Sequence, residues 1–265
     1  MYSKFYSVLI LTVLVFSVFL LGGCLSPKDP NLLKVGISGQ MQPYSFYDDN
    51  TNELVGFDVD IANEISKRLN KKIELQVYSY NRLIPAILSN QIDFGMGSMN
   101  IVEERKQVVN FTIPYNVSRG KFVVSKDLKD INTIEDIKNS TQLVGVRNGT
   151  VYPRTLINNY SFNPDKLKIF PSQRDLKIAI LAGTVKVAIS DFGAMHYLNK
   201  NNDIDLKFVG LVTEADAGIT VNKNNTALLD ELNTALQSMI EDGTYEKIAI
   251  KWFEANPLVK TKSEI

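Results

Sequence analysis

The chain has one cysteine and one histidine among its 265 residues. A zinc site needs several thiolate or imidazole ligands, and a cysteine–histidine nucleophile needs both groups in one cleft. Residues 44–52 look briefly like a calcium loop, but Glu53 and Val59 stand where that loop needs glycine and a bidentate glutamate. No metal ion and no cysteine-based catalysis are therefore expected.

The chain also lacks an excess of either charge, with 29 Lys and Arg against 29 Asp and Glu. A balanced chain creates no bulk field that attracts nucleic acid. Gly95-Met96-Gly97 hints at a dinucleotide fingerprint, but Asn100 occupies the third glycine position, and no Walker loop or nucleophile elbow is present. We expect no cofactor, no catalytic residues and no nucleic-acid partner.

One long apolar run is present, at the N-terminus. Lys4 precedes the run Phe5–Leu21, and Leu21-Gly22-Gly23-Cys24 follows it. This tetrad resembles a lipoprotein processing box, which implies a signal peptide over residues 1–23, lipidation of Cys24 and a linker to residue 31. An uncleaved transmembrane anchor is the alternative. Both interpretations place the rest of the chain outside the cytoplasm and tethered to a membrane.

After the linker, strand patterns alternate with helix patterns. The order strand, helix, strand, helix, strand predicts a parallel sheet covered by helices, in the ranges Leu32–Ile37, Phe57–Leu69, Lys72–Tyr78, Leu83–Leu88 and Ile92–Gly97. Ligands bind beyond the carboxyl ends of such strands. The loop from Ser38, Tyr80 and the stretch Ser98–Arg105 each follow a strand, so we expect them on one rim. Ser98-Met99-Asn100 is predicted to be a polar turn.

Arg105 is unusual because it falls in the first turn of a predicted helix, near the positive end of the helix dipole. An anion held by Arg105, the free N–H groups and Ser98 would reverse that penalty, and a guanidinium suits a carboxylate. Asn100 and Glu103 have the spacing of a capping box. The alternative is an exposed arginine paired with a neighbouring glutamate.

A second α/β unit follows and has a rim of its own. Arg147-Asn148-Gly149-Thr150 and Ser190-Asp191 each end a predicted strand. A helix is predicted directly after Thr150, and Ser172 is the predicted cap of a later helix. Two further strands are predicted, Phe208–Leu211 and Gly218–Val221. Two rims that face each other would form a cleft, which is the expected place for a small ligand.

These pieces together resemble the extracytoplasmic solute-binding proteins of family 3, which serve ABC importers of polar amino acids. The resemblance runs from Leu33 to Phe253 and is carried by Pro43-Tyr44-Ser45-Phe46, Val55-Gly56-Phe57-Asp58-Val59-Asp60-Ile61-Ala62, Leu83-Ile84-Pro85-Ala86-Ile87-Leu88, Asp93, Glu103-Glu104-Arg105, Phe111-Thr112-Ile113-Pro114-Tyr115, Val144-Gly145-Val146-Arg147-Asn148-Gly149-Thr150, Ser190-Asp191, Asp242-Gly243-Thr244-Tyr245-Glu246-Lys247-Ile248 and Lys251-Trp252-Phe253.

The resemblance implies the two-lobed type II periplasmic-binding fold, an α/β fold with two open mixed sheets flanked by helices and joined by a two-segment hinge. Lobe one would comprise residues 32–114 and 219–265, and the hinge crossings with lobe two would comprise residues 115–218. The implied substrate-binding roles are Arg105 for the α-carboxylate with Ser98 and Asn100 as donors, Asp191 for the α-ammonium, Thr150 from lobe two and Tyr80 over the ligand.

Three positions depart from the family pattern and bear on the ligand's side chain. Met41 replaces the first-loop aromatic residue and specifies shape less. Ser38 stands where members that bind basic side chains carry an acid. Arg147 would favour an acidic or amide end if it points inward, and would have no such role if it reaches into solvent.

The function that the resemblance implies is binding rather than catalysis. The chain would be a monomeric substrate-binding component that carries a free amino acid to a membrane permease and its ATPase, anchored outside the cell membrane as a lipoprotein. The alternatives are an extracytoplasmic cyclohexadienyl or arogenate dehydratase on the same fold, with Asp191 as its acid, a ligand-sensing domain, and a purely structural lipoprotein.

Overall fold

The structure is a computed structural model that describes residues 29–201 and 205–258. The described residues from Leu33 onward form one compact unit. The expected signal peptide and Cys24 lie outside the described residues. Among the helices that the structure describes, none combines the length and the apolar character needed to cross a bilayer.

A nine-stranded mixed sheet organises this unit, in the order β10-β9-β11-β8-β12-β6-β1-β5, with β7 also paired to β12. Neighbours β1 and β6 are parallel, as are β9 with β10 and with β11, whereas β8 and β12 run antiparallel to their neighbours. The strands are β1 Leu32–Ile37, β5 Lys72–Val77, β6 Phe94–Asn100, β7 Val109–Phe111, β8 Asn116–Ser125, β9 Val144–Arg147, β10 Leu167–Phe170, β11 Val187–Asp191 and β12 Leu206–Asn222.

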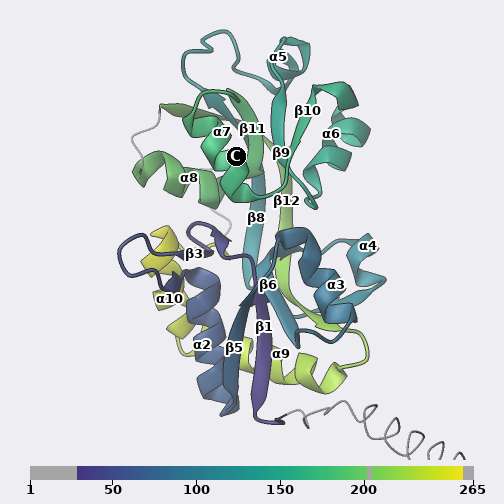
Figure 1. Ribbon diagram of the computed structural model, residues 1–265, viewed down its shortest axis with the longest axis vertical. Coiled ribbons are helices and arrows are strands. Elements are labelled where there is room, and N and C mark those ends of the chain that lie inside the picture. Colours follow the sequence, from purple (N-terminus) through teal and green to yellow (C-terminus); the bar gives the residue numbers. More distant parts are fainter. Residues whose placement is uncertain (1–28, 202–204, 259–265) are drawn as a thin grey trace, which may run out of the picture. The chain divides into compact units, whose positions relative to one another are not determined.

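Helices cover the two ends of this sheet (Figure 1). Helix α2 contacts β5, α3 contacts β6, and α9 contacts α2 and β12. At the other end, α7 contacts β9, β10 and β11, and α8 contacts β8 and β11. The helices are α2 Phe57–Leu69, α3 Leu83–Leu88, α4 Glu103–Lys106, α5 Ile134–Asn139, α6 Tyr152–Tyr160, α7 Gln173–Leu181, α8 Phe192–Asn201, α9 Thr226–Glu241 and α10 Thr244–Phe253, with short 3-10 turns at η1 Tyr80–Arg82 and η2 Pro164–Lys166.

Local signals explain where several of these helices begin and end. Helix α2 buries Ile61 and Ile65 on its apolar face and ends at Asn70 in the left-handed conformation. The Ser172 side chain accepts a hydrogen bond from the Asp175 backbone N–H at the start of α7, which confirms the predicted cap. The predicted bounds of β1, α2 and α3 are confirmed.

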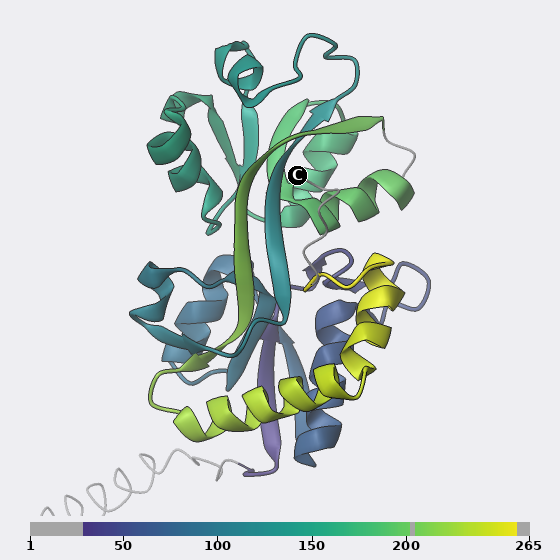
Figure 2. The same ribbon diagram turned by 180° about the vertical axis from the view of Figure 1, so that it is seen from behind.

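The long strands β8 and β12 lie side by side and run from one set of helices to the other (Figure 2). The sequence predicted two separate strands, Phe208–Leu211 and Gly218–Val221, where the structure has one strand of 17 residues. Register shifts at Val209–Leu211, Leu211–Thr213 and Gly218–Thr220 interrupt its pairing without ending the strand. The two mixed halves of the sheet are therefore continuous through this pair.

Two expectations near the rim are wrong. Residues 98–100 were expected to form a polar turn, but they complete β6 because Met99 and Asn100 pair with Gly218 and Ala217 of β12. The capping box is also absent: Val102 is the N-cap of α4, and no side chain caps it. A small sheet that was not predicted, β2 Gln40–Met41, β3 Ser45–Tyr47 and β4 Leu54–Val55, follows β1.

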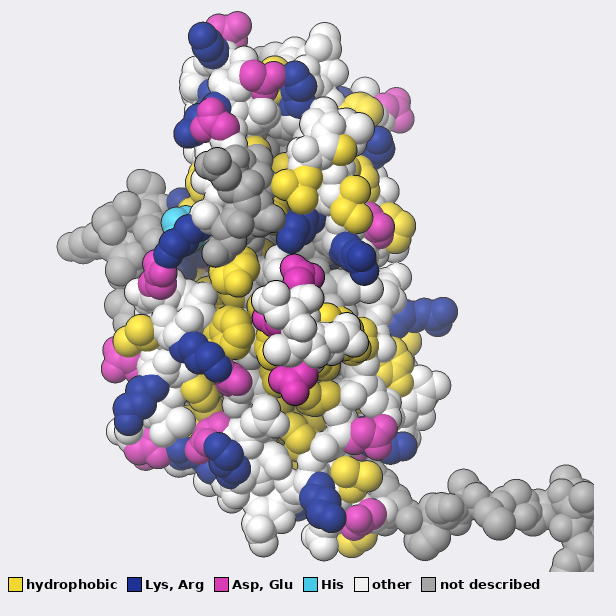
Figure 3. Space-filling view, turned by 60° about the vertical axis from the view of Figure 1, so that its left-hand side comes forward, with side chains coloured by type: hydrophobic (Ala, Val, Ile, Leu, Met, Phe, Trp, Pro, Cys, Tyr) yellow, Lys and Arg dark blue, Asp and Glu magenta, His cyan; other side chains and the backbone are white. Residues whose placement is uncertain are grey.

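The surface carries both charges, as the composition predicts. Lys and Arg side chains alternate with Asp and Glu side chains over the face in Figure 3. Neither charge dominates this face, so it offers no single-sign field to a large charged partner.

Candidate functional site

The candidate residues lie where strands end. Ser98 and Asn100 close β6, Arg147 closes β9 and Asp191 closes β11, while Tyr80 opens η1 shortly after β5. The carboxyl ends of sheet strands are the usual position for ligands in open α/β folds. This placement agrees with the rim expected from the sequence.

Arg105 extends from the short helix α4 toward the loop after β9. Its Nη1 donates to the Asn100 carbonyl at 3.1 Å, and its Nη2 donates to the Gly149 carbonyl at 3.0 Å. Both partners are carbonyl oxygens, so neither cancels its charge. The side chain is part-exposed, and its neighbour Glu104 forms an ion pair with Arg154 instead. The alternative of an Arg105–glutamate pair therefore does not describe the structure.

Arg147 points inward and is 7% exposed. Its guanidinium carbon lies 4.1 Å from the centre of the Tyr80 ring, and Nη1 donates to the Met41 sulfur at 3.3 Å. Arg105 approaches the same ring at 5.8 Å. Burial lowers the pKa of Arg147, against the opposing influence of Tyr80, Tyr152 and Asp191. The solvent-facing alternative for Arg147 is therefore wrong.

Asp191 is the last residue of β11 and is 4% exposed. Its Oδ1 accepts from the Tyr44 hydroxyl at 2.8 Å and from the Ala194 backbone N–H at 3.3 Å, while Oδ2 has no partner among the described residues. Burial raises the pKa of this carboxyl, and the hydrogen bond from Tyr44 opposes the rise.

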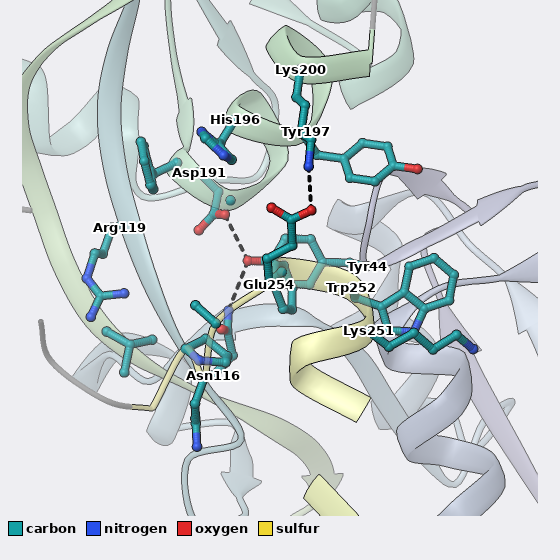
Figure 4. Close-up of a pocket in the computed structure, with 17 residues that line it drawn as sticks. Tyr44, Asn116, Arg119, Asp191, His196, Tyr197, Lys200, Lys251, Trp252 and Glu254 are labelled. Atoms are coloured by element: carbon teal, nitrogen blue, oxygen red, sulfur yellow. Dashed lines mark hydrogen bonds and ion pairs between the residues drawn. The ribbon is translucent and has the colours of Figure 1, made fainter. Parts of the chain in front are cut away.

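A chain of buried hydrogen bonds connects Asp191 to Ser98. Asn116 Nδ2 donates to the Tyr44 hydroxyl at 3.1 Å and to Ser98 Oγ at 2.7 Å, and Tyr44 in turn donates to Asp191. Figure 4 shows Tyr44 between Asp191 and Asn116. Asn116 is the first residue of β8. These hydrogen bonds therefore connect that long strand to the ends of β6 and β11.

The backbone of Ser98 is fixed in position by hydrogen bonds to Tyr115. It has φ +51°, and its N–H and that of Gly97 both donate to the Tyr115 hydroxyl, at 2.9 and 3.2 Å. Tyr115 donates to Asp58 Oδ1 at 2.9 Å. The hydroxyl thereby uses its proton and both lone pairs, which fixes the direction of all three bonds.

The remaining candidates are less directly engaged. Thr150 donates its hydroxyl hydrogen bond to the Arg147 carbonyl at 2.8 Å, and the helix it was expected to open, α6, has Val151 as its N-cap. Ser38 is buried and shares a 3.2 Å hydrogen bond with Ser45. Asn100 is buried, and its side-chain Nδ2 has no partner among the described residues.

Sequence reasoning missed Tyr44, Asn116, Tyr115 and Asp58. Tyr44, Asp58 and Tyr115 fall within stretches that carry the resemblance, but no signal in the sequence assigns them a partner. Their roles depend on contacts between segments 17 to 147 residues apart, which local patterns do not reveal.

A cavity of about 360 Å³ borders Asp191 and Tyr44 (Figure 4). It is lined by residues of β8, α8 and the segment 251–257. Lys200 of α8 forms an ion pair with Glu254 of that segment. Arg105, Tyr80 and Arg147 do not line it. The cavity thus differs from the cleft expected between the two rims, where Arg147 lies against Tyr80 and Met41. Within the described ranges, no group of acids, histidines or cysteines could hold a metal ion.

Comparisons with known proteins identify the family. Bacterial extracellular solute-binding proteins, family 3, match residues 33–255. The histidine-binding periplasmic protein of Escherichia coli K12 is 29% identical over 85% of this chain and 88% of its own length, and the L-cystine-binding protein TcyJ of the same strain is 28% identical over 86% and 85%.

Solved structures give the same fold. An ancestral arginine-binding protein bound to glutamine is 34% identical, with a TM-score of 0.77 over 85% of this chain and 99% of its own. The arginine-, lysine- and histidine-binding protein ArtJ from Geobacillus stearothermophilus is 25% identical, with a TM-score of 0.77 over 85% and 96%. The chain therefore belongs to the bacterial extracellular solute-binding proteins of family 3, and its fold is the two-lobed type II periplasmic-binding fold.

Proposed function

We propose that this chain is the substrate-binding component of an ABC importer for a polar amino acid, and that it clamps the ligand's zwitterionic head group between Arg105 and Asp191. One observation carries the proposal. Asp191 Oδ2 is a buried acceptor without a partner among the described residues, and Asp191 is near enough to Arg147 to influence it electrostatically. Buried polar atoms are nearly always satisfied, so Oδ2 is a candidate acceptor for a ligand's ammonium group.

Each end of the head group has suitable partners. The planar Arg105 guanidinium can exchange its two carbonyl acceptors for a carboxylate, and Asn100 Nδ2 is a further donor without a partner in the described chain. Ser98 lies on the same strand end, and Asp191 Oδ2 accepts from the ammonium group. Thr150 joins from the loop after β9 by turning its hydroxyl away from the Arg147 carbonyl.

The remaining residues enclose the ligand's side chain. Tyr80 supplies a ring face that Arg147 and Arg105 already approach. Ser38 lies in the loop after β1, and Met41 lies in the short strand β2. Family relatives named for histidine, cystine and arginine show that one fold serves different side chains. In this proposal the head-group contacts are shared by ligands with different side chains, and separate residues bind the side chain.

Binding would proceed by closure of two lobes, residues 32–114 with 219–265 and residues 115–218, about the pair β8 and β12. The open form holds the amino acid through Arg105 and Ser98, and closure then adds Asp191 and Thr150. Closure is driven by the ligand's better fit to the closed state. Asn116 takes part in this closure, since it is the first residue of β8 and its side chain donates hydrogen bonds to both Ser98 and Tyr44.

Titration calorimetry with the common amino acids tests the function, using Arg105→Ala, Asp191→Asn and the parent. Both variants should lose about 100-fold or more in affinity, because each leaves one buried charge of the ligand unpaired. Arg105→Ala should unfold within about 1 kcal/mol of the parent, since Arg105 is part-exposed and bonds only carbonyl groups. Arg82→Ala, at an exposed arginine, is the matched control.

Parent-like affinity in Arg105→Ala would defeat the head-group assignment. Turnover of arogenate or prephenate by the parent, followed by product absorbance, would favour the dehydratase alternative, with Asp191 as the general acid.

Anchoring and assembly are separate parts of the proposal. Cys24 would carry the lipid and hold a monomer outside the cell membrane, where its closed form meets the permease and ATPase. Cells that express Cys24→Ala should release the protein from the membrane fraction and should not incorporate labelled palmitate into it. Membrane retention of that variant would favour the uncleaved anchor.

A further inference from the structure

Arg147 is a buried cation for which the described chain supplies no anion. Its guanidinium contacts the Tyr80 ring face at 4.1 Å and the Met41 sulfur at 3.3 Å, and Nε has no partner among the described residues. A ring face and a thioether are weak partners for a guanidinium. A buried charge without a hydrogen-bonded counter-charge is costly, so its retention here calls for an anion from elsewhere.

The buried carboxyls of the described chain do not fill this role. Asp191 influences Arg147 through space, but its Oδ1 accepts from Tyr44 and its Oδ2 has no partner in the part of the chain that the structure describes. Asp58 accepts from Tyr115, and Asp93 accepts from the Lys34 backbone N–H. The donors in these hydrogen bonds are groups other than the Arg147 guanidinium.

The site therefore holds two guanidinium groups and one carboxylate. In the proposed binding mode, Arg105 and Asp191 pair with the ligand's α-carboxylate and α-ammonium, which leaves Arg147 unbalanced. A ligand with a second carboxylate neutralises the whole site. A neutral amino acid leaves one positive charge buried, and a basic amino acid adds a second one beside Arg147.

We propose that Arg147 determines specificity, and that the ligand is an amino acid with an acidic side chain whose carboxylate pairs with the Nε edge of Arg147. This inference rests on the proposed function. The position of Arg147 supports it, because its guanidinium already occupies the space between Tyr80 and Met41. A ligand guanidinium would have to displace the Arg147 guanidinium from that space, whereas a carboxylate needs only to reach its unpaired Nε.

The full chain is titrated by calorimetry with L-glutamate, L-aspartate, L-glutamine and L-arginine. One of the two acidic amino acids should bind at least about 100-fold more tightly than arginine and at least about 10-fold more tightly than glutamine. Arg147→Met keeps the stem that packs on Tyr80 and removes the charge. It should lose about 100-fold or more for the acidic ligand and less than about 10-fold for glutamine. Arg82→Met, at an exposed arginine, should match the parent.

The outcomes separate this inference from the proposed function. Arginine or glutamine binding to the parent as tightly as glutamate and aspartate would overturn the role of Arg147 while leaving amino-acid binding in place. So would Arg147→Met with parent-like affinity for the acidic ligand. No binding of any common amino acid would overturn the proposed function itself. If Arg147→Met does not fold, the ligand preference of the parent decides whether Arg147 determines specificity. Arg147→Lys, which keeps the positive charge, then serves as the second variant for the same titration.

Discussion

Replacing Asp58 with asparagine should change how the stability of this protein depends on pH. Asp58 is fully buried, accepts a hydrogen bond from Tyr115 at 2.9 Å, and has no partner for Oδ2 among the described residues. Burial raises its pKa from 3.8 to about 7, against the hydrogen bond from Tyr115. Each pKa unit corresponds to about 1.4 kcal/mol, so ionising this group in the folded protein costs about 4 kcal/mol.

The direction follows from proton linkage. The folded state binds the Asp58 proton more tightly than the unfolded state does, so stability is highest below about pH 4 and falls as the pH rises through about 7. Between about pH 5 and pH 8 this group should remove about 2.5 kcal/mol from the free energy of unfolding of the parent. The amide of the Asp58→Asn variant does not titrate, and its carbonyl oxygen can still accept from Tyr115.

Urea unfolding of both proteins at about pH 5 and about pH 8 measures the effect. The stability of Asp58→Asn relative to the parent should rise by about 2.5 kcal/mol between the two pH values. Asp191, whose pKa burial also raises, is present in both proteins, so its contribution cancels in the difference. Asp230→Asn, at a more accessible position of α9, is the control and should keep a constant difference from the parent. A constant difference for Asp58→Asn as well would refute the reasoning.

Three substitutions and one control, Gly183→Ala, test other contacts of the fold. Tyr44→Phe removes the 2.8 Å hydrogen bond to buried Asp191 and should lower the free energy of urea unfolding by about 1–3 kcal/mol; an unchanged midpoint would contradict this. Gly56→Ala should cost about 2 kcal/mol or more, because φ is +136° and an added Cβ would lie 2.2 Å from the Tyr44 carbonyl oxygen. Gly183→Ala, also at positive φ but with open space around it, should cost clearly less in the same experiment, and equal losses would exclude the clash. Ser172→Ala removes the cap of α7 and should lower stability by about 1 kcal/mol in thermal unfolding, and an unchanged melting temperature would rule out a stabilising cap.

Elements with local signals were predictable from the sequence. The bounds of α2 follow from its apolar face and from the left-handed residue that ends it, and Ser172 caps α7 through a residue three positions away. Such interactions join residues within one or two turns, so the sequence alone contains both partners. Family membership was predictable for the same reason, since the motifs that carry it are contiguous.

Elements that depend on distant pairing were not predictable. Residues 98–100 contain glycine-flanked polar side chains typical of a turn, but pairing with β12 makes them a strand. The break expected within β12 is absent because β8 pairs along most of its length. In both places a partner more than 75 residues away overrides the local preference.

The sequence by itself determined the α/β order, the family and the residue types at the strand ends, including Arg105, Arg147 and Asp191. Only the tertiary structure decided where those side chains point and which of their atoms have partners. Tyr44 reaches Asp191 across 147 residues of sequence, and the ring of Tyr80 holds the guanidinium of Arg147. Burial and neighbouring groups set the pKa of a charged side chain and the partners it can bind, and both are properties of the folded chain.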